Sequence, residues 1–436
     1  MARLRARGPV GEVRECSRHR RFREEPAGRS SRQAQKMSGG SRVKALYGIT
    51  VGGSANSLLR GQLAWLRARG WEIVLVTNRD ERAKKAAHRE QVTLREIPMR
   101  RNMSPLRDLT ALARWVRTLR IEAPDVVNAS TPKAGLLGMV ASWIMRVPRR
   151  VYVVRGLRLE GAEGLGALVL WVVEWLTMRA ATDIVFVSRS LAEATFARGL
   201  GRRSRAWLIG AGSSNGVDAA SIARRAQESD GVAIRRQLGV APEAFVAGFI
   251  GRVTSDKGAD TIAEAAVDPT LDPRWHFLVV GSVEDEGIAA RLDGASSVTR
   301  LDSMDAVWSL LSAMDVLVLP TRREGFPNVV LEAASARTPA ITTRATGAVD
   351  SIVDGETGLL FPFGDVGALV AILDDLAGDP DRMETMGRAA EARAFRDFVP
   401  EDIWEGVHQI MSGNVTSSRV SRLDRPLTAA PIGDHR

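Results

Sequence analysis

The chain has 436 residues, of which 45% are hydrophobic and 26% are charged, so it is long enough to form two hydrophobic cores. Its longest apolar runs, residues 134–145 and 164–173, are shorter than the ~20 residues that a membrane-spanning helix requires. The single cysteine, Cys16, excludes disulfides and cysteine-ligated zinc within the chain, and the five histidines lack metal-ligand spacing, so no metal site is expected.

The net charge of +10 is concentrated at the N-terminus. Residues 1–36 carry ten Arg and one Lys against four Glu, a net charge of +7. Because large apolar residues are scarce there, we predict a disordered basic extension over residues 1–41. Three interpretations compete. The segment is a tail that contacts anionic lipid or nucleic acid, or a targeting peptide, or the product of a start codon upstream of the true start at Met37. The missing apolar segment argues against targeting, and the strand predicted soon after Met37 favours a start there.

From residue 42 onward, short apolar runs alternate with helical segments. Continuous apolar strands between helices are typical of parallel sheets that are covered on both faces. Residues 42–208 are therefore predicted to form a Rossmann-like, doubly wound α/β domain. Its predicted strands are residues 43–49, 73–77, 126–127, 150–154 and 184–187.

Two helical segments of this domain, residues 134–145 and 164–180, are rich in Leu, Val and Trp. Such helices either pack on a parallel sheet or present a face that docks on a membrane. The first interpretation is favoured, because buried helices are the commoner case beside a parallel sheet.

The Gly- and Ser-rich stretch IGAGSSNGVD, residues 209–218, predicts a domain boundary. A second alternating series follows, so residues 209–397 are predicted to form a second Rossmann-like domain. Residues 398–411 are predicted to form a helix that packs back on the first domain, and residues 412–436 a disordered tail. The predicted strands of the second domain are residues 245–250, 277–280, 316–319 and 340–342.

Three segments at predicted strand ends carry possible chemistry. Gly52 and Gly53 follow the first strand, where glycines admit a ligand and the next helix N-terminus favours anions. The full dinucleotide fingerprint is absent, so a tight turn without a ligand is an equal alternative. In GFIGRVTSDKGAD, Arg252 and Lys257 follow a strand and suit a diphosphate, although solvated surface charges are the alternative.

The third segment, PTRREGFPNVVLEAASA, is the most informative. Pro327 falls near the first helical position, so amides around Phe326 to Val329 are free to face a ligand. Glu324 in the loop and Glu332 in the helix favour binding of sugar hydroxyls. Two acids also suit a glycosidase, but the neighbouring cations indicate a phosphate leaving group instead. Asp379-Pro380-Asp381 follows a helix and is interpreted as a turn, not a metal site.

In order along the chain, these motifs resemble those of the family 4 retaining glycosyltransferases, over residues 42–411. EGFPNVVLEA is similar to the Glu-x7-Glu motif, GRVTSDKG to the phosphate-binding segment, and IGAGSSNGVD to the interdomain stretch. STPKAGLLG and VVRGLRLEG resemble motifs of members that build capsular, O-antigen or lipid-linked glycans. The resemblance implies the GT-B fold, an α/β architecture with two Rossmann-like domains facing across a cleft.

The resemblance also implies roles for individual residues. Arg252 and Lys257 would bind the donor diphosphate, Glu324 would hold a donor-sugar hydroxyl near the reacting carbon, and Glu332 would bind the ribose. The remaining implied site residues are Gly251, Phe326, Pro327, Asn328 and Val329 on the donor side and Gly52, Gly53, Lys133 and Arg155 on the acceptor side.

The function implied is transfer of a hexose or N-acetylhexosamine-type sugar, with retention, from a nucleotide-sugar donor to a lipid-linked or glycan acceptor. UDP is favoured over GDP, and no metal or other cofactor is expected, since fixed cations neutralise the diphosphate. The expected location is the cytoplasm, with peripheral contact with the inner face of the membrane, and no nucleic-acid partner. The alternatives are a GT-B-fold sugar-nucleotide epimerase and a non-catalytic nucleotide-sugar-binding protein.

Two positions that carry a His in many relatives depart from the family pattern. Arg155-Gly156 stands where many relatives have a His-Gly pair, and Asn128-Ala129-Ser130 replaces a segment with a second His. Arginine cannot act as a base at neutral pH. Retaining members are thought to react on one face of the sugar without an enzyme nucleophile, so the change need not abolish catalysis. Arg155 can bind phosphate or a carboxylated sugar, or form a salt bridge in the cleft.

Overall fold

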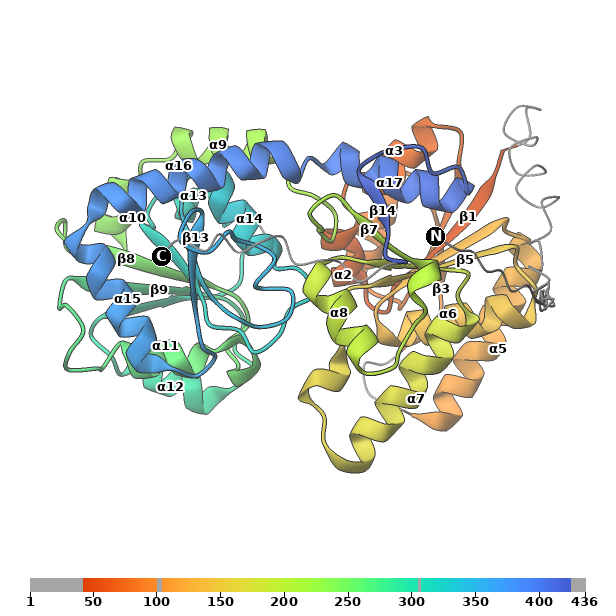
Figure 1. Ribbon diagram of the computed structural model, residues 1–436, viewed down its shortest axis with the longest axis horizontal. Coiled ribbons are helices and arrows are strands. Elements are labelled where there is room, and N and C mark those ends of the chain that lie inside the picture. The colour runs from red at the N-terminus through yellow and green to blue at the C-terminus, as the bar shows by residue number, and fades with distance from the viewer. Residues whose placement is uncertain (1–41, 100–103, 305–306, 425–436) are drawn as a thin grey trace, which may run out of the picture.

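The computed structural model describes residues 42–99, 104–304 and 307–424. The predicted extension at residues 1–41, the proposed start at Met37 and residues 425–436 lie outside the described residues. The described chain forms two α/β units, each built on its own sheet (Figure 1). This is the two-domain α/β architecture expected from the sequence.

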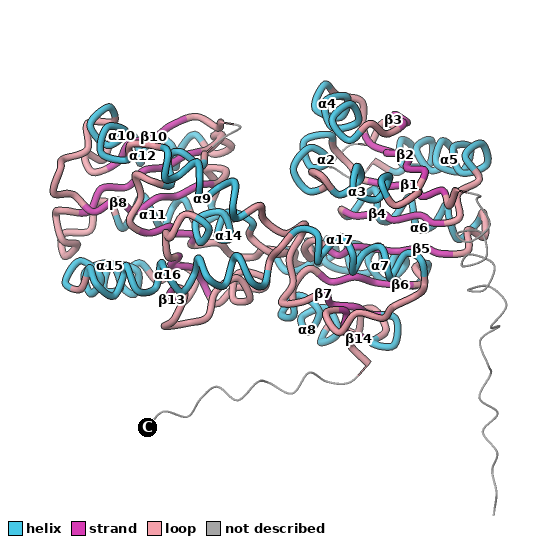
Figure 2. The backbone as a smooth tube through the Cα atoms, turned by 90° about the horizontal axis from the view of Figure 1, so that it is seen from above, coloured by secondary structure: helices cyan, strands magenta, loops and turns pink. Residues whose placement is uncertain are grey.

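The first sheet has eight strands in the order β14-β7-β6-β5-β4-β1-β2-β3, which Figure 2 shows from above. All neighbouring strands are parallel except β14 and β7. The central strands are almost wholly buried, which explains their continuous apolar sequences. The strands are β1 (Lys44–Gly48), β2 (Glu72–Thr77), β3 (Thr93–Glu96), β4 (Val126–Ser130), β5 (Arg149–Val154), β6 (Asp183–Phe186), β7 (Ala206–Ile209) and β14 (Val420–Arg422).

Local sequence signals mark the N-terminal ends of several helices of this unit. Asp80 accepts a hydrogen bond from the amide of Ala83 and caps α4, and Pro105 and Pro132 occupy the first turns of α5 and α6. The helices are α2 (Gly52–Leu58), α3 (Gln62–Ala68), α4 (Glu81–Glu90), α5 (Pro105–Glu122), α6 (Pro132–Ile144), α7 (Gly164–Ala180) and α8 (Arg189–Ala197), with the short 3-10 turns η1 (Arg158–Gly161) and η2 (Arg203–Arg205).

The second sheet has six parallel strands in the order β10-β9-β8-β11-β12-β13. Its strands are β8 (Phe245–Ile250), β9 (Trp275–Val280), β10 (Val298–Leu301), β11 (Val316–Leu319), β12 (Ala340–Thr343) and β13 (Gly358–Phe361). Its helices are α9 (Ala219–Glu228), α10 (Gly231–Gln237), η3 (Ser255–Lys257), α11 (Ala259–Ala265), α12 (Glu286–Asp293), α13 (Trp308–Leu311), α14 (Asn328–Ser335), α15 (Val366–Gly378) and α16 (Pro380–Asp397).

The chain returns to the first unit after α16. Helix α17 (Pro400–Ser412) packs against α3 (Figure 1). The rings of Trp404 and Trp65 lie 6.1 Å apart edge to face. The Trp404 indole also donates a hydrogen bond of 2.8 Å to Asn215 in the linker between the sheets. This helix therefore ties the second unit and the linker to the first.

The predicted disordered tail at residues 412–436 is wrong for its first part. Ser412 ends α17, and β14 pairs antiparallel with β7, with Val420 and Leu423 buried. Pairing satisfies backbone groups of β7 that would otherwise lie at an open sheet edge. A three-residue strand with one apolar residue carries no periodic sequence signal, so only the edge of the sheet specifies it.

The prediction that both apolar helices are buried is confirmed for most of α6 and wrong for the outer face of α7. Helix α6 lies between α5 and α7, whereas the outer side of α7 exposes large apolar side chains, such as Leu165 and Trp175. An all-apolar sequence does not reveal how many neighbours a helix has, because both helices lack a polar side.

Each sheet has a point where the strand order reverses, between β1 and β4 and between β8 and β11. In open parallel sheets, loops at the carboxyl ends of such strands diverge and leave a crevice for a ligand. The loops after these four strands are therefore the places to look for a functional site.

Candidate active site between the two sheets

Two adjoining cavities of about 270 and 570 Å³ lie where the loops after β1, β4, β8 and β11 meet. Thr131, Arg158, Arg252 and Arg323 are among the residues that line both. Together the cavities are lined by six basic and three acidic side chains, so the site is positively charged. A cleft with this charge attracts a diphosphate.

The loop after β8 contributes two of the predicted cations. Arg252 directly follows Gly251 at the end of β8, and Lys257 ends η3. Both line the smaller cavity, where the Lys257 ammonium forms an ion pair with Glu324. Arg252 forms an ion pair with Glu284. The structure thus brings together the three residues predicted to be catalytic, Arg252, Lys257 and Glu324.

The other residues predicted to bind the donor are not part of the lining of either cavity. Gly251 bonds to the carbonyl of Val280. Phe326 packs against Phe398 with the rings tilted and their centres 5.5 Å apart. Pro327 is the N-cap of α14, one residue earlier than a first helical position, and Val329 is half-buried in its first turn.

Two polar groups of α14 are held in unusual surroundings. The side-chain oxygen of Asn328 is buried and has no hydrogen-bond partner among the described residues. Burial raises the pKa of Glu332, which accepts a hydrogen bond from Trp308 and lies near Arg60 of the first unit. Glu332 is also outside the lining of the two cavities, so these polar groups could meet only a ligand that extends along α14.

The opposite wall carries Lys133 and Arg155. The Lys133 ammonium lies 2.7 Å from Asp108 and lines the larger cavity. Arg155 lines the smaller one and donates a hydrogen bond of 2.6 Å to the carbonyl of Ser214 in the linker. Burial lowers the pKa of Arg155 to about 10, and its Nε has no partner among the described residues. The bond to Ser214 ties Arg155 to a backbone carbonyl.

Gly52 and Gly53 do not line either cavity; Val51 and Ser54 line the larger one instead. Gly52 packs on Asp80, whose carboxylate accepts its amide hydrogen at 2.9 Å, and a Cβ there would lie 2.0 Å from that carboxylate. The glycine is required by contact with a side chain of its own domain. This fits the tight-turn alternative.

Thr131 is a site residue that sequence reasoning missed. It has φ of +69°, which is rare for a β-branched residue, and Thr50 bonds to its hydroxyl through its amide and its own hydroxyl. Backbone strain of this kind is concentrated at functional sites. Thr131 directly follows β4, and this position was the sequence signal that could have identified it as a site residue. Arg158, Arg323 and Asp256 were also missed, although each follows a predicted strand.

The two units contact each other directly beside the site. The Thr346 hydroxyl donates to Glu160 at 2.8 Å, and the amide of Gly347 donates to Ser190 at 2.7 Å. Gly325 lies so close to Arg155 that a Cβ at this glycine would be 2.2 Å from the Arg155 carbonyl oxygen. The described conformation is therefore one in which the loops of the two units touch.

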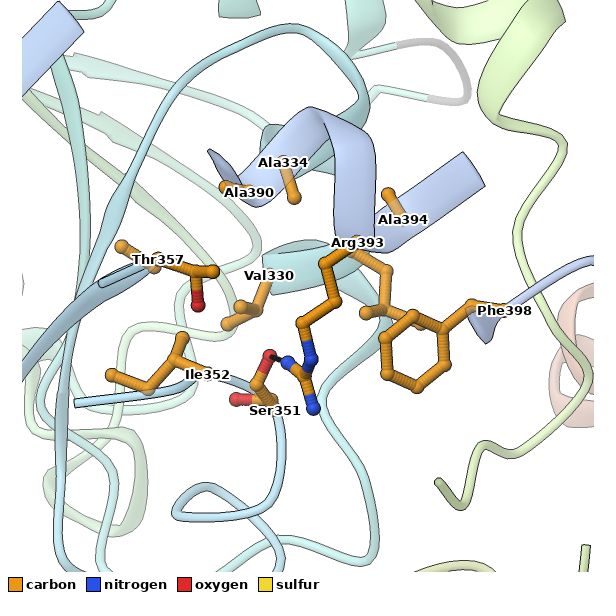
Figure 3. A pocket seen from close by; sticks show the side chains of 11 residues that line it. Val330, Ala334, Ser351, Ile352, Thr357, Ala390, Arg393, Ala394 and Phe398 are labelled. Atoms are coloured by element: carbon orange, nitrogen blue, oxygen red, sulfur yellow. Dashed lines mark hydrogen bonds between the residues drawn. The ribbon is translucent and has the colours of Figure 1, made fainter. Parts of the chain in front are cut away.

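A third cavity, lined in part by α14, has a volume of about 10 Å³, room for one water (Figure 3). Arg393 crosses it and donates hydrogen bonds to the carbonyls of Ser351 and Asp350. This cavity is a packing feature and cannot hold a nucleotide. Within the described ranges, no group of three or more His, Cys, Asp or Glu side chains has an arrangement suited to a metal ion.

Two family models match the chain. Residues 52–212 match the glycosyl transferase 4-like domain, and residues 244–379 match the glycosyl transferases group 1. The chain is 32% identical over 368 residues to the capsular polysaccharide biosynthesis glycosyltransferase CapM of Staphylococcus aureus, covering 83% of this chain and 95% of CapM.

A second relative is the UDP-Gal:alpha-D-GlcNAc-diphosphoundecaprenol alpha-1,3-galactosyltransferase of Escherichia coli, with 27% identity over 63% of this chain and 73% of that protein. Among solved structures, HepE of Anabaena in complex with UDP and glucose has a TM-score of 0.71 at 22% identity, covering 85% of this chain and all of HepE. WaaG, a glycosyltransferase of lipopolysaccharide biosynthesis, has a TM-score of 0.64 at 17% identity, with coverage of 85% and 100%. These similarities identify the fold as GT-B.

Proposed function

This chain belongs to the group 1 glycosyl transferases, and from that premise we propose that it transfers a hexose or N-acetylhexosamine-type sugar from a UDP-sugar. The proposed acceptor is a lipid-linked glycan, and the product is a surface polysaccharide such as a capsule or O-antigen. One observation carries the proposal: Arg252, Lys257 and Glu324 line one cavity between two facing sheets.

The donor side supports a diphosphate leaving group. Arg252 and Lys257 are each paired with a carboxylate, Glu284 and Glu324. A bound diphosphate would take over these cations and free Glu324 to accept a hydrogen bond from a sugar hydroxyl. The same cations would stabilise the negative charge that develops as the diphosphate leaves, so we propose that transfer needs no metal ion.

The acceptor side is the wall formed by the first unit. Thr131, Lys133 and Arg158 line the larger cavity, which opens beside the donor cations. As the resemblance to retaining family members implies, an acceptor hydroxyl bound there would approach the sugar carbon from the side on which the diphosphate leaves. The new carbon–oxygen bond forms as the bond to phosphate breaks, and the acceptor proton passes to the departing phosphate oxygen. We therefore propose retention of the anomeric configuration.

The relatives support the choice of donor and acceptor. The Escherichia coli relative is described as using UDP-Gal and a GlcNAc-diphosphoundecaprenol acceptor, and CapM as acting in capsular polysaccharide biosynthesis. A diphosphate-linked acceptor also suits the excess of basic side chains in the cleft. We propose a cytoplasmic protein that contacts the inner face of the membrane peripherally.

The first test is thermal unfolding of the full chain with UDP, GDP or ADP in the presence of EDTA. We expect UDP to stabilise the protein, by about 2.7 kcal/mol at a hundredfold excess over its Kd, and GDP and ADP to act weakly. Lys257→Ala should lose this stabilisation, whereas Lys85→Ala, a matched change at an exposed lysine of α4, should keep it. Stabilisation only when Mg²⁺ replaces EDTA would contradict a metal-independent donor site.

The second test is turnover. Glu324→Ala should reduce transfer to an undecaprenyl-diphosphate-linked sugar at least about a hundredfold, since removing one group that acts in the transition state has effects of this size. The anomeric configuration of the product is read by NMR. UDP binding without transfer would favour a non-catalytic nucleotide-sugar-binding protein, and an isomerised UDP-sugar without acceptor would favour an epimerase.

A further inference from the structure

Helix α7 has an apolar outer face. Leu165, Leu168 and Val169, then Val172 and Trp175, follow at helical spacing and are exposed. The fraction of Leu165 that is exposed, 83%, is too large for a residue that merely covers a neighbouring side chain. The polar residues of this helix that are buried, Glu174 and Thr177, lie on the side that packs on α6 and β5. The helix is thus turned with its apolar stripe toward solvent, against the usual direction.

Neighbouring helices extend this apolar area. Helix α6 contacts both α5 and α7, so the three lie side by side on one face of the sheet (Figure 1). The C-terminal end of α6 exposes Trp143 and Ile144, and the first turns of α5 expose Leu106 and Leu109. We refer to the exposed surface of α5, α6 and α7 as the α5–α7 face.

The same face is cationic. Arg107, Arg114, Arg117 and Arg120 of α5 are all exposed and share one side of the helix. None of the four forms an ion pair with a residue of the described chain. The two acids of α5 are neutralised elsewhere. Asp108 pairs with Lys133, and the buried Glu122 pairs with Lys44 and Arg95.

An apolar helix stripe beside a row of unpaired arginines fits an anionic lipid bilayer. Leucine and valine side chains enter the boundary between headgroups and acyl chains, tryptophan lies at the interface, and arginines contact lipid phosphates. In the described chain no helix combines the length and apolar character that a membrane span needs.

We propose that the α5–α7 face is the surface by which the protein docks on an anionic bilayer. The proposal deepens the proposed function, on which it rests for its biological purpose. Arg158 lines both cavities and opens η1, and the chain enters α7 only six residues later. A lipid-linked acceptor could therefore keep its tail in the bilayer below α7 while its diphosphate and sugar reach the cleft.

The test is flotation of the full chain with vesicles of phosphatidylglycerol and phosphatidylcholine, compared with phosphatidylcholine alone. We expect binding that is at least about tenfold tighter to the anionic vesicles and that weakens with salt. The variant Leu165→Ser/Leu168→Ser/Val172→Ser should bind either vesicle at least about tenfold more weakly.

The matched control changes exposed apolar residues of the other unit, Val232→Ser/Val267→Ser/Phe395→Ser, and should bind as the wild type does. The variant Arg107→Gln/Arg114→Gln/Arg117→Gln should lose the preference for anionic vesicles. Equal flotation of the α7 variant and the control variant would overturn the proposal, as would failure of the wild type to bind vesicles. So would light scattering that shows a dimer which the α7 variant converts to a monomer, since the face would then be a protein interface.

Stabilisation by UDP in EDTA separates this proposal from the proposed function. Each variant should keep that stabilisation, because none of the changed residues lines the two cavities. Loss of vesicle binding with UDP stabilisation intact is the expected result for the α7 variant. A wild type that responds to UDP but ignores vesicles would refute only the docking surface, and one that binds vesicles but not UDP would refute only the donor site.

Discussion

Glu174 lies on the inner side of α7 and should make the stability of the protein fall as pH rises. Only 3% of this residue is exposed, and the Tyr152 hydroxyl donates a hydrogen bond of 3.0 Å to its carboxyl group. Burial raises the pKa of Glu174 from 4.5 to about 7, and the bond from Tyr152 offsets this only in part. In the folded protein, the carboxyl group therefore holds its proton through mildly acidic pH.

Whether stability rises or falls with pH depends on whether the folded or the unfolded state binds more protons. Between pH 4.5 and 7 the unfolded chain has lost this proton while the folded chain keeps most of it, so raising the pH favours unfolding. The contribution is complete below pH 4.5 and is lost above about pH 7. The difference between the two pKa values corresponds to about 3 kcal/mol in the free energy of unfolding. About 2.5 kcal/mol of this is lost between pH 5 and pH 8.

The measurement is urea unfolding of the full chain from pH 5 to pH 8, compared with Glu174→Gln. Glutamine keeps an oxygen that accepts from Tyr152 but cannot ionise. The free energy of unfolding of the wild type should fall relative to this variant by about 2.5 kcal/mol over the range. Glu163→Gln, at the exposed residue that precedes α7, is the control and should follow the wild type. Parallel pH profiles for wild type and Glu174→Gln would show that the pKa of Glu174 is not raised in the folded protein.

Three further substitutions test the site. Lys257→Ala should lower kcat at least about a hundredfold with little change in Tm; near-normal turnover would remove its assignment to the leaving group. Gly325→Ala places a Cβ 2.2 Å from the Arg155 carbonyl oxygen, so it should disturb the contact between the two units and lower kcat with little change in Tm; an unchanged kcat would show that turnover does not need this contact. Gly258→Ala, at φ +76° with a Cβ 1.9 Å from the Pro320 carbonyl oxygen, should destabilise the protein by about 2 kcal/mol or more in urea unfolding; wild-type stability would mean that the loop relaxes freely.

Much of the fold could be read from the sequence because both sheets are parallel and buried. Strands such as β4 and β11 are covered on both sides, so they appear as continuous apolar runs between helices. Arg252 and Glu324 follow strands that are adjacent in the second sheet, β8 and β11. Because parallel strands end at the same edge, their position along the chain was enough to predict that they meet.

The features that the sequence did not predict depend on contacts between distant segments. Thr131 and Arg252 line the same two cavities only because loops of both units meet there. The strand β14 is ordered by the open edge of β7. Glycine at position 52 is required by the carboxylate of Asp80, twenty-eight residues away.

The two apolar helices, α6 and α7, show most clearly what could not be predicted from the sequence alone. By composition alone, α6 and α7 are equally apolar and neither has a polar side, so their sequences determine that both are helices and no more. Helix α6 is buried because α5 and α7 flank it, whereas no helix covers the outer side of α7 in the described chain. The strands, the helices and the charged loops at the strand ends could be predicted from local spacing along the chain. Which apolar surface stays exposed and which loops share a cavity could not be predicted in this way, because burial depends on neighbours that are distant along the chain.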